Sequence, residues 1–270
     1  MKRYLYACVA TLMMIVGALG CSSVPLSGRS QLNLVSDDAV LQSSFAQYSD
    51  FIQKAPQSKN KEGIRLVQEI GARIAKATDT YLRANGAAAD AEKMRWEFHL
   101  IDSDQVNAFC MPGGKIVVYE GILPVAKSAD QLATVMSHEV AHAIAKHANE
   151  RMSQQILKQY GAQVLAQVMV GKGESTQLLT GLLYNVGSEV FFSLPYSRKH
   201  EYEADQIGLY LMALAGYDYE QAEQFWINMS QGKGSQSDFL STHPSDAKRI
   251  AAIRAELPKV RAFMKSAVAR

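Results

Sequence analysis

The chain has 270 residues, of which 48% are hydrophobic and 20% charged, and its formal net charge is +2. This composition is that of an ordinary globular protein with enough apolar material for a core. Once Lys2 and Arg3 are lost with the leader described next, 26 basic residues balance 26 acidic ones. A neutral balance gives no electrostatic attraction to nucleic acid, so we expect no nucleic-acid partner.

The N-terminal segment has the pattern of a secretory signal. Lys2 and Arg3 precede an apolar run from Tyr4 to Leu19, as in the charged and hydrophobic regions of a signal peptide. The run ends in Ala-Leu-Gly-Cys, a lipobox-like sequence in which cleavage leaves Cys21 to be lipidated. We therefore predict a lipoprotein signal peptide at residues 1–20 and lipidation of Cys21. A retained membrane anchor and ordinary signal cleavage are the alternatives.

The segment after Cys21 is small and polar, which suits a tether over residues 21–35 between a lipid anchor and a folded body. Ser22 is not the aspartate that often signals retention in the inner membrane. This favours anchoring in the outer membrane, and hence a location on the periplasmic side of the cell envelope. Cys110 then has no cysteine to pair with, so we expect no disulfide.

Two amphipathic helices are expected first. Ser36 can cap a helix whose apolar stripe extends to Ile52, and a second stripe from Ile64 to Ile74 stops near Gly86. Both stripes are most simply core-facing, and we assign them no chemistry.

Two strands follow. Residues 95–100 alternate between polar and apolar side chains, and His99 lies on the polar side, where an exposed strand histidine is expected rather than a ligand. Gly113 and Gly114 indicate a turn into a second strand, Ile116–Tyr119. We expect this strand to be the sheet edge that holds an extended substrate through its main chain. A plain internal hairpin is the alternative.

The central feature is an H-E-x-x-H motif that begins at His138. His138 and His142 are four positions apart and project from the same face of a helix, so both imidazoles can reach one metal ion. Glu139 projects beside them and can take a proton from a water that the metal activates. A capping box and an apolar stripe place the motif in a helix that we expect to run to about Lys146. A surface helix that carries these residues by chance is the alternative.

Beyond the motif we expect a polar tail and two apolar stretches. His147 comes five residues after His142, off the ligand face, and we expect it in a solvated helical tail with Glu150 and Arg151. Residues 161–194 contain two apolar stretches, neither long enough for a transmembrane helix. We expect a helix packed on the body there, with a mobile lid over the cleft as the alternative.

A catalytic zinc usually has three protein ligands and one open position for water. The last histidine of the metzincin pattern is replaced by Ala148, so a glutamate from a later helix is the other source. Glu201 and Asp205 are four apart and share a face. Glu201 can therefore bind the metal while Asp205 accepts the other ring N–H of a ligand histidine. Glu203 is the rival ligand, but it lacks an acidic partner one turn further on.

The motif, followed by S-R-x-x-E-x-E-A-D at residues 197–205, resembles the zinc metallopeptidase family that includes HtpX and the CAAX prenyl proteases (metallopeptidase family 48). It is most similar to periplasmic lipoprotein members such as LoiP. The resemblance runs from about Asn107 to Arg249. In that family the glutamate that opens E-x-x-A-D is the third zinc ligand, so the resemblance implies this role for Glu201.

The resemblance also implies roles for two later residues. A histidine-proline step of the family is matched by His243 and Pro244. His243 would either stabilise the transition state or swing in as a fourth, inhibitory ligand. Arg249 resembles a family arginine that reaches toward the site, where it could hold an oxyanion. From the residues alone, a histidine at a helix start and a surface arginine, both without a role, are the alternatives.

Together these features predict a mainly helical α+β protein, with a zincin-like (gluzincin) metallopeptidase domain and a small β-sheet over residues 36–270. We expect one zinc ion, held by His138, His142 and Glu201, and an endopeptidase that cleaves misfolded or unassembled envelope polypeptides through water activated by Glu139. The alternative is a metal-containing envelope lipoprotein that acts as a chaperone or assembly factor, with its site closed by His243.

Overall fold

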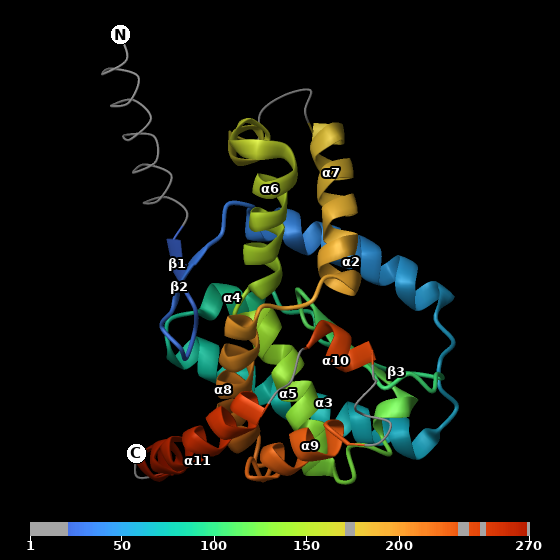
Figure 1. The fold of residues 1–270 in the computed structure, drawn as a ribbon, viewed down its shortest axis with the longest axis vertical. Helices are drawn as coiled ribbons and strands as arrows, with labels where there is room; N and C mark the ends of the chain where they lie inside the picture. Colours follow the sequence, from blue (N-terminus) through green and yellow to red (C-terminus); the bar gives the residue numbers. More distant parts are fainter. Residues whose placement is uncertain (1–20, 171–175, 232–237, 244–246, 269–270) are drawn as a thin grey trace.

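The structure is a computed structural model, and it describes residues 21–170, 176–231, 238–243 and 247–268. The predicted signal peptide, residues 1–20, lies outside this range. Helices dominate the fold, with a small sheet on one side (Figure 1). In chain order the elements are β1 (Cys21–Ser23), β2 (Ser30–Leu32), α2 (Asp37–Lys54), α3 (Lys61–Ala84), α4 (Ala88–Glu92), β3 (Glu97–Ile101), β4 (Ala108–Met111), β5 (Lys115–Tyr119), η1 (Glu120–Ile122), α5 (Ala129–Ile144), α6 (His147–Val170), α7 (Thr176–Ser188), the π-helical turn η2 (Glu189–Ser193), α8 (Arg198–Leu214), α9 (Gln221–Met229), α10 (Asp238–Thr242) and α11 (Ala247–Val268). The predicted class, mainly helical α+β, is confirmed.

The sheet beside α5 has three strands in the order β3-β5-β4. β3 is parallel to β5, whereas β4 is antiparallel to it, with Ala108 opposite Val118. Gly113 and Gly114 both have positive φ, and their turn folds β4 back onto β5. The prediction that Ile116–Tyr119 forms the edge is therefore wrong. β5 is paired on both sides, and β3 and β4 are the two edge strands of this sheet.

α5 lies at the centre of the molecule. Every residue from Gln131 to Ile144 is buried, and α3, α8, α9 and β4 pack around the helix. The side chain of Ser128 accepts the backbone N–H of Gln131, which confirms the predicted start of the helix. A helix that is buried on all sides holds its side chains more firmly than a surface helix does, and this one carries the H-E-x-x-H motif.

The pair of helices α6 and α7 extends from one end of the body (Figure 1). At their base, Met152, Leu183, Val186 and Val190 are buried in a second core cluster with Val40 of α2. The helix predicted between residues 161 and 194 is thus packed on the body at this end. None of the described helices combines the length and the apolar character needed to cross a membrane.

Residues 21–35 differ from the tether expected there. They form the β1–β2 hairpin, and Val24, which follows β1, is 2% exposed and belongs to the main core. Arg29 of the hairpin forms ion pairs with Glu150 at 2.8 Å and with Glu203 at 2.7 Å. These contacts hold the segment against the body, so it is part of the folded domain.

Candidate metal centre

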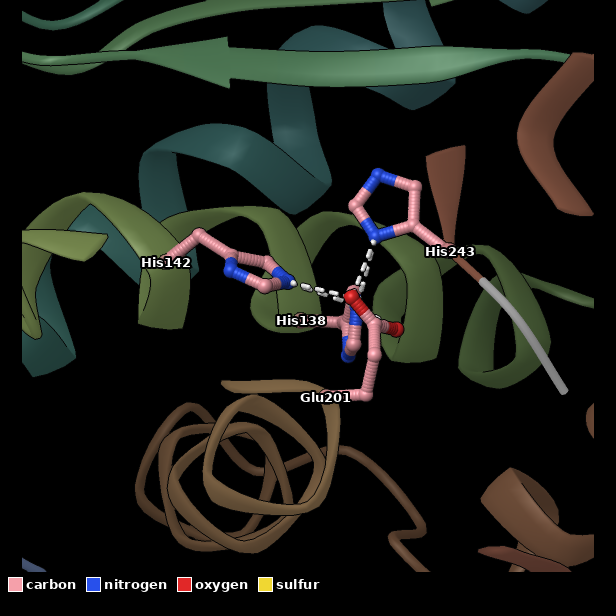
Figure 2. A group of neighbouring side chains, drawn as sticks. All are labelled: His138, His142, Glu201 and His243. Carbon is pink, nitrogen blue, oxygen red and sulfur yellow. Dashed lines mark hydrogen bonds and ion pairs between the residues drawn. The ribbon is translucent and has the colours of Figure 1, made fainter. Parts of the chain in front are cut away.

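Four donor side chains converge beside α5. His138 and His142 come from α5, Glu201 from α8 and His243 from the residue after α10 (Figure 2). One ligand atom from each lies within 4.8 Å of all the others. All four side chains are buried, with His243 the most exposed at 2%. Polar groups that are this deeply buried need partners, and here the partners are one another.

The separations between these atoms match a tetrahedral metal site. Nε2 of His138 lies 3.1 Å from Nε2 of His142 and 3.3 Å from Nδ1 of His243. The carboxylate oxygens of Glu201 lie 3.5, 3.4 and 3.1 Å from the donor nitrogens of the same three histidines. Ligands about 2.0–2.1 Å from a tetrahedral zinc ion are about 3.3 Å apart. The residues present therefore fit the metal that the motif predicts.

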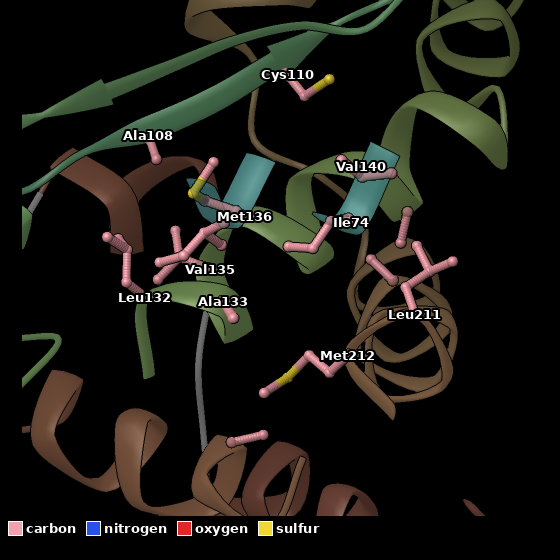
Figure 3. Packing of buried hydrophobic residues seen from close by; sticks show 14 of the residues in the cluster. Ile74, Ala108, Cys110, Leu132, Ala133, Val135, Met136, Val140, Leu211 and Met212 are labelled. Carbon is pink, nitrogen blue, oxygen red and sulfur yellow. The ribbon is translucent and has the colours of Figure 1, made fainter. Parts of the chain in front are cut away.

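A close crossing of α5 and α8 brings Glu201 to the two motif histidines. Gly208 of α8 makes the crossing possible, because a Cβ at this position would lie 3.2 Å from the backbone nitrogen of His138. Apolar side chains from both helices and from neighbouring elements fill the interior around the crossing, among them Ile74, Val135, Met136, Val140, Leu211 and Met212 (Figure 3).

Asp205 makes the contact that the sequence led us to expect, with Oδ1 3.0 Å from Nδ1 of His138. Arg249 contacts the ligands and their acidic partner directly, and its predicted oxyanion role stays a prediction. Its guanidinium is paired with Asp205 and Glu201, each at 2.5 Å, and lies 3.7 Å from the ring of Trp226. Arg249 is 1% exposed and does not line the cavity described next. It can position the carboxylates of Glu201 and Asp205 and balance their charge.

A cavity of about 300 Å³ lies beside the ligands, and both Glu139 and His243 line it. Ala108 and Phe109 of the edge strand β4 also border the cavity. Oε1 of Glu139 accepts no hydrogen bond within the described residues and lies 3.4 Å from Nε2 of His243. A buried carboxylate oxygen without a donor is free to accept one from water or substrate.

The prediction that His147 lies in a solvated tail is wrong. α5 ends at Ile144, and Lys146 has φ 54, so the chain turns sharply before α6. His147 is 0% exposed, and its Nδ1 lies 2.8 Å from Nδ1 of His142. Glu203, the rival for third ligand, lies 2.9 Å from Nε2 of His147 and is not in the donor cluster. An uninterrupted helix would have carried His147 away from the ligands.

Burial and nearby charges set the protonation of the site. Burial raises the pKa of Glu139 to about 7, as suits a group that takes up and releases a proton near neutral pH. Burial alone would also raise the pKa of Glu201, but Arg249 and His243 hold it well below its usual range. Burial keeps the pKa of His142 well below its ordinary value, so the ring is neutral, as a metal ligand must be.

The sequence reasoning missed Tyr196, which lies just before α8. Its ring centre is 3.8 Å from that of His142 and 5.0 Å from that of His243, and it lines the cavity. Tyr196 N–H donates to the carbonyl of Thr242, which ties the loop that carries His243 to the start of α8. Its position just before the capping residue Ser197 was a local signal that this side chain would point toward the start of the ligand helix.

Comparison with known proteins connects this geometry to a family. Residues 67–257 match the model of peptidase family M48. Mitochondrial metalloendopeptidase OMA1 of Schizosaccharomyces pombe is 35% identical over 246 residues, which cover 87% of this chain and 66% of that protein. The Arabidopsis thaliana protein of the same name is 41% identical over 168 residues, or 62% of this chain and 33% of that one.

A more distant relative is the beta-barrel assembly-enhancing protease of Yersinia pestis, which is 25% identical over 63% of this chain and 36% of that protein. The chain spans between 33% and 66% of the length of these three relatives. The particular resemblance to LoiP-like members stays a prediction.

The predicted location is contradicted by these relatives. The first six relatives are mitochondrial OMA1 enzymes, which overturns the expectation of an outer-membrane lipoprotein on the periplasmic side of an envelope. That expectation depended on a short pattern within the first 22 residues, whereas the comparison with Schizosaccharomyces pombe covers 87% of the chain. Lipidation of Cys21 stays a prediction.

Proposed function

Because the chain belongs to peptidase family M48, we propose that it is a zinc-dependent endopeptidase that hydrolyses peptide bonds in polypeptide substrates. The observation that carries the proposal is the buried set of four donor atoms, all within 4.8 Å of one another, beside a cavity lined by Glu139. Two histidines and a glutamate are the ligands of a catalytic zinc, and a general base within reach is what hydrolysis needs in addition.

His138, His142 and Glu201 would hold the metal, with Asp205 and Arg249 fixing the ligands from behind. Zinc bound there acts as a Lewis acid toward water and the substrate carbonyl. Glu139 takes a proton from the attacking water and then gives it to the leaving amine. Its pKa of about 7 supports both transfers, since the carboxylate is neither a very weak base nor a very weak acid at neutral pH.

The substrate would be an extended stretch of polypeptide. β4 has an unpaired side among the described residues and borders the cavity. A chain in extended conformation can add to such an edge through main-chain hydrogen bonds, without regard to its sequence. We infer that unfolded or unassembled proteins, which offer extended segments, are the substrates.

A second function is supported by the position of His243. A tetrahedral metal held by four protein donors has its coordination sphere filled, so His243 has to withdraw before a substrate can approach. If His243 stays in place, the protein would act as a chaperone or assembly factor that contains a metal and turns over no peptide.

Digestion of casein by the purified protein separates the two functions. We expect cleavage that a chelator abolishes and added zinc restores. The Glu139→Gln variant should bind zinc as the wild type does and cleave at least about 100-fold more slowly, because it retains the ligands and lacks the base. Undiminished cleavage by this variant would refute the proposed mechanism. Lack of cleavage by both wild type and His243→Ala, with casein aggregation suppressed, would favour the chaperone role.

A further inference from the structure

We propose that His147 positions the metal ligand His142, and that Glu203 and Arg29 hold His147 in place. These residues form a chain of contacts that begins at the metal site and ends in the N-terminal β1–β2 hairpin. The inference rests on the metal site of the proposed function, because His142 is a ligand there.

Hydrogen-bonding capacity fixes the direction of each contact. Nε2 of His147 lies 2.9 Å from Oε2 of Glu203, and since a carboxylate only accepts, this nitrogen donates. A neutral imidazole has one donor and one acceptor nitrogen, so Nδ1 of His147 accepts a hydrogen bond from Nδ1 of His142, 2.8 Å away. The lone pair of His142 is then on Nε2, which is the nitrogen in the donor cluster.

Each of the two motif histidines is thereby linked through its Nδ1 to a carboxylate. His138 meets the carboxylate of Asp205 directly, with 3.0 Å between Nδ1 and Oδ1. His142 reaches the carboxylate of Glu203 through the ring of His147. An acidic partner behind a ligand histidine fixes its tautomer and ring orientation and makes it a stronger base toward the metal.

The turn between α5 and α6 contains an unfavourable backbone conformation. Lys146 has φ 54, a left-handed conformation that is unfavourable for a residue with a side chain. Nζ of Lys146 is 2.8 Å from both Asp37 and Asp90, and these ion pairs offset the cost. The turn brings His147 back against His142. A straight continuation of the helix would avoid the strain and would lose this contact.

Arg29 of the β1–β2 hairpin is the last residue in the chain of contacts. Nε of Arg29 lies 2.7 Å from Glu203, and its Nη2 lies 2.8 Å from Glu150. Glu150 lies 3.1 Å from Nε2 of His200, whose ring stacks on that of His147 at 4.3 Å. Arg29 thus holds the two acidic residues that border the stacked rings. Its side chain is 13% exposed, so the ion pairs are poorly screened by water.

Zinc affinity tests the proposal without reference to catalysis. The dissociation constant for zinc would be measured by competition with a chelator for wild type, His147→Phe and His147→Asn. Phenylalanine fills the volume of the ring but accepts no hydrogen bond, whereas asparagine can place an amide oxygen near the position of Nδ1. We expect the Phe variant to bind zinc about 10–100-fold more weakly and the Asn variant to stay within a few-fold of wild type. The visible spectrum of the Co²⁺-loaded protein should change in the Phe variant alone.

His99→Phe is the matched control, because His99 is a partly buried histidine whose partners, Gln57 at 3.1 Å and Glu97 at 3.7 Å, are not in the donor cluster. Unfolding of the metal-free proteins in urea would be measured in parallel. A zinc affinity of the His147→Phe variant equal to that of wild type would overturn the proposal. Equal weakening in the Phe and Asn variants, in step with lost stability, would also overturn it, since packing alone would then explain the effect.

Arg29→Met removes the contact at the hairpin end of the chain and leaves the rings of His142 and His147 intact. It therefore tests the proposal even if the His147→Phe variant does not fold. We expect weaker zinc binding by several-fold, and an unchanged affinity would remove the hairpin from the proposal. A protein that shows these differences but digests no casein would refute the proposed endopeptidase and leave the positioning role standing.

Discussion

Nε2 of His243 lies 3.4 Å from Oε1 of Glu139, while Nδ1 of the same ring lies 3.1 Å from Oε1 of Glu201. One imidazole therefore stands between the general base and a metal ligand. Phe239 stacks on this ring at 4.5 Å and Tyr196 at 5.0 Å, so aromatic contacts hold it there on two sides. Under the proposed function, this ring has to withdraw before a substrate can reach the metal.

Replacing His243 by alanine should open the fourth coordination position of the metal. We expect acetohydroxamate, a small bidentate metal ligand, to bind the zinc-loaded His243→Ala protein at least about 10-fold more tightly than wild type, since no ring has to be displaced. Isothermal titration would measure both affinities. His99→Phe should bind the compound as wild type does. Equal affinities in wild type and His243→Ala would mean that His243 does not occupy the metal.

Removing the guanidinium of Arg249 should destabilise the metal-free protein strongly. Arg249→Met leaves the carboxylates of Glu201 and Asp205 buried without their cation, and loss of one partner of a buried ion pair costs about 3–5 kcal/mol. Arg254, on the same helix, is 66% exposed in its pair with Glu223, so Arg254→Met should change stability much less. Urea unfolding of the metal-free variants would measure the free energy of unfolding that each one loses. Similar losses would show that Arg249 is not acting through the buried carboxylates.

Gly208→Ala should weaken zinc binding by pushing α8 away from α5. The added Cβ would lie 3.2 Å from the backbone of His138, and overpacking of this kind costs about 1–3 kcal/mol against a gain in helix propensity of about 1 kcal/mol. Gly181→Ala gains the same propensity on α7, where a Cβ meets no atom within 4 Å. Chelator competition should show weaker zinc binding for Gly208→Ala alone. Equal zinc affinities of the Gly208→Ala and Gly181→Ala variants would argue against a tight crossing of α5 and α8.

The stability of the fold should depend on pH through Glu150. Burial would raise its pKa, but hydrogen bonds from His200 and Arg29 lower it to about 2, from an ordinary value of 4.5. A carboxyl whose pKa is lower in the folded state stabilises the fold above its unfolded pKa and loses that effect as the pH falls. The advantage of wild type over Glu150→Gln, roughly 3 kcal/mol at pH 7, should therefore shrink between about pH 4.5 and 2. A difference that stays constant over this range would contradict the assignment.

The motif and its immediate chemistry could be predicted from the sequence because they are local. Four-residue spacing on a helix places His138 and His142 on one face in any fold that keeps the helix, and the same rule pairs Glu201 with Asp205 on theirs. Serine caps likewise fix where helices begin, as Ser36 does for α2 and Ser128 for α5. The helical class and the metal-binding residue types therefore followed from short-range regularities, and the family was indicated by the resemblance of two short motifs.

Only the tertiary structure decided which groups stand behind and beside the ligands. The left-handed residue Lys146 is stabilised by Asp37 and Asp90 from distant parts of the chain, so no local pattern could predict that His147 would turn inward. Arg249 is buried because two carboxylates from another helix need a cation, and strand pairing placed β5 between β3 and β4, which left β4 at one edge. These outcomes depend on the free energy of contacts between residues far apart in sequence, which spacing along the chain does not encode.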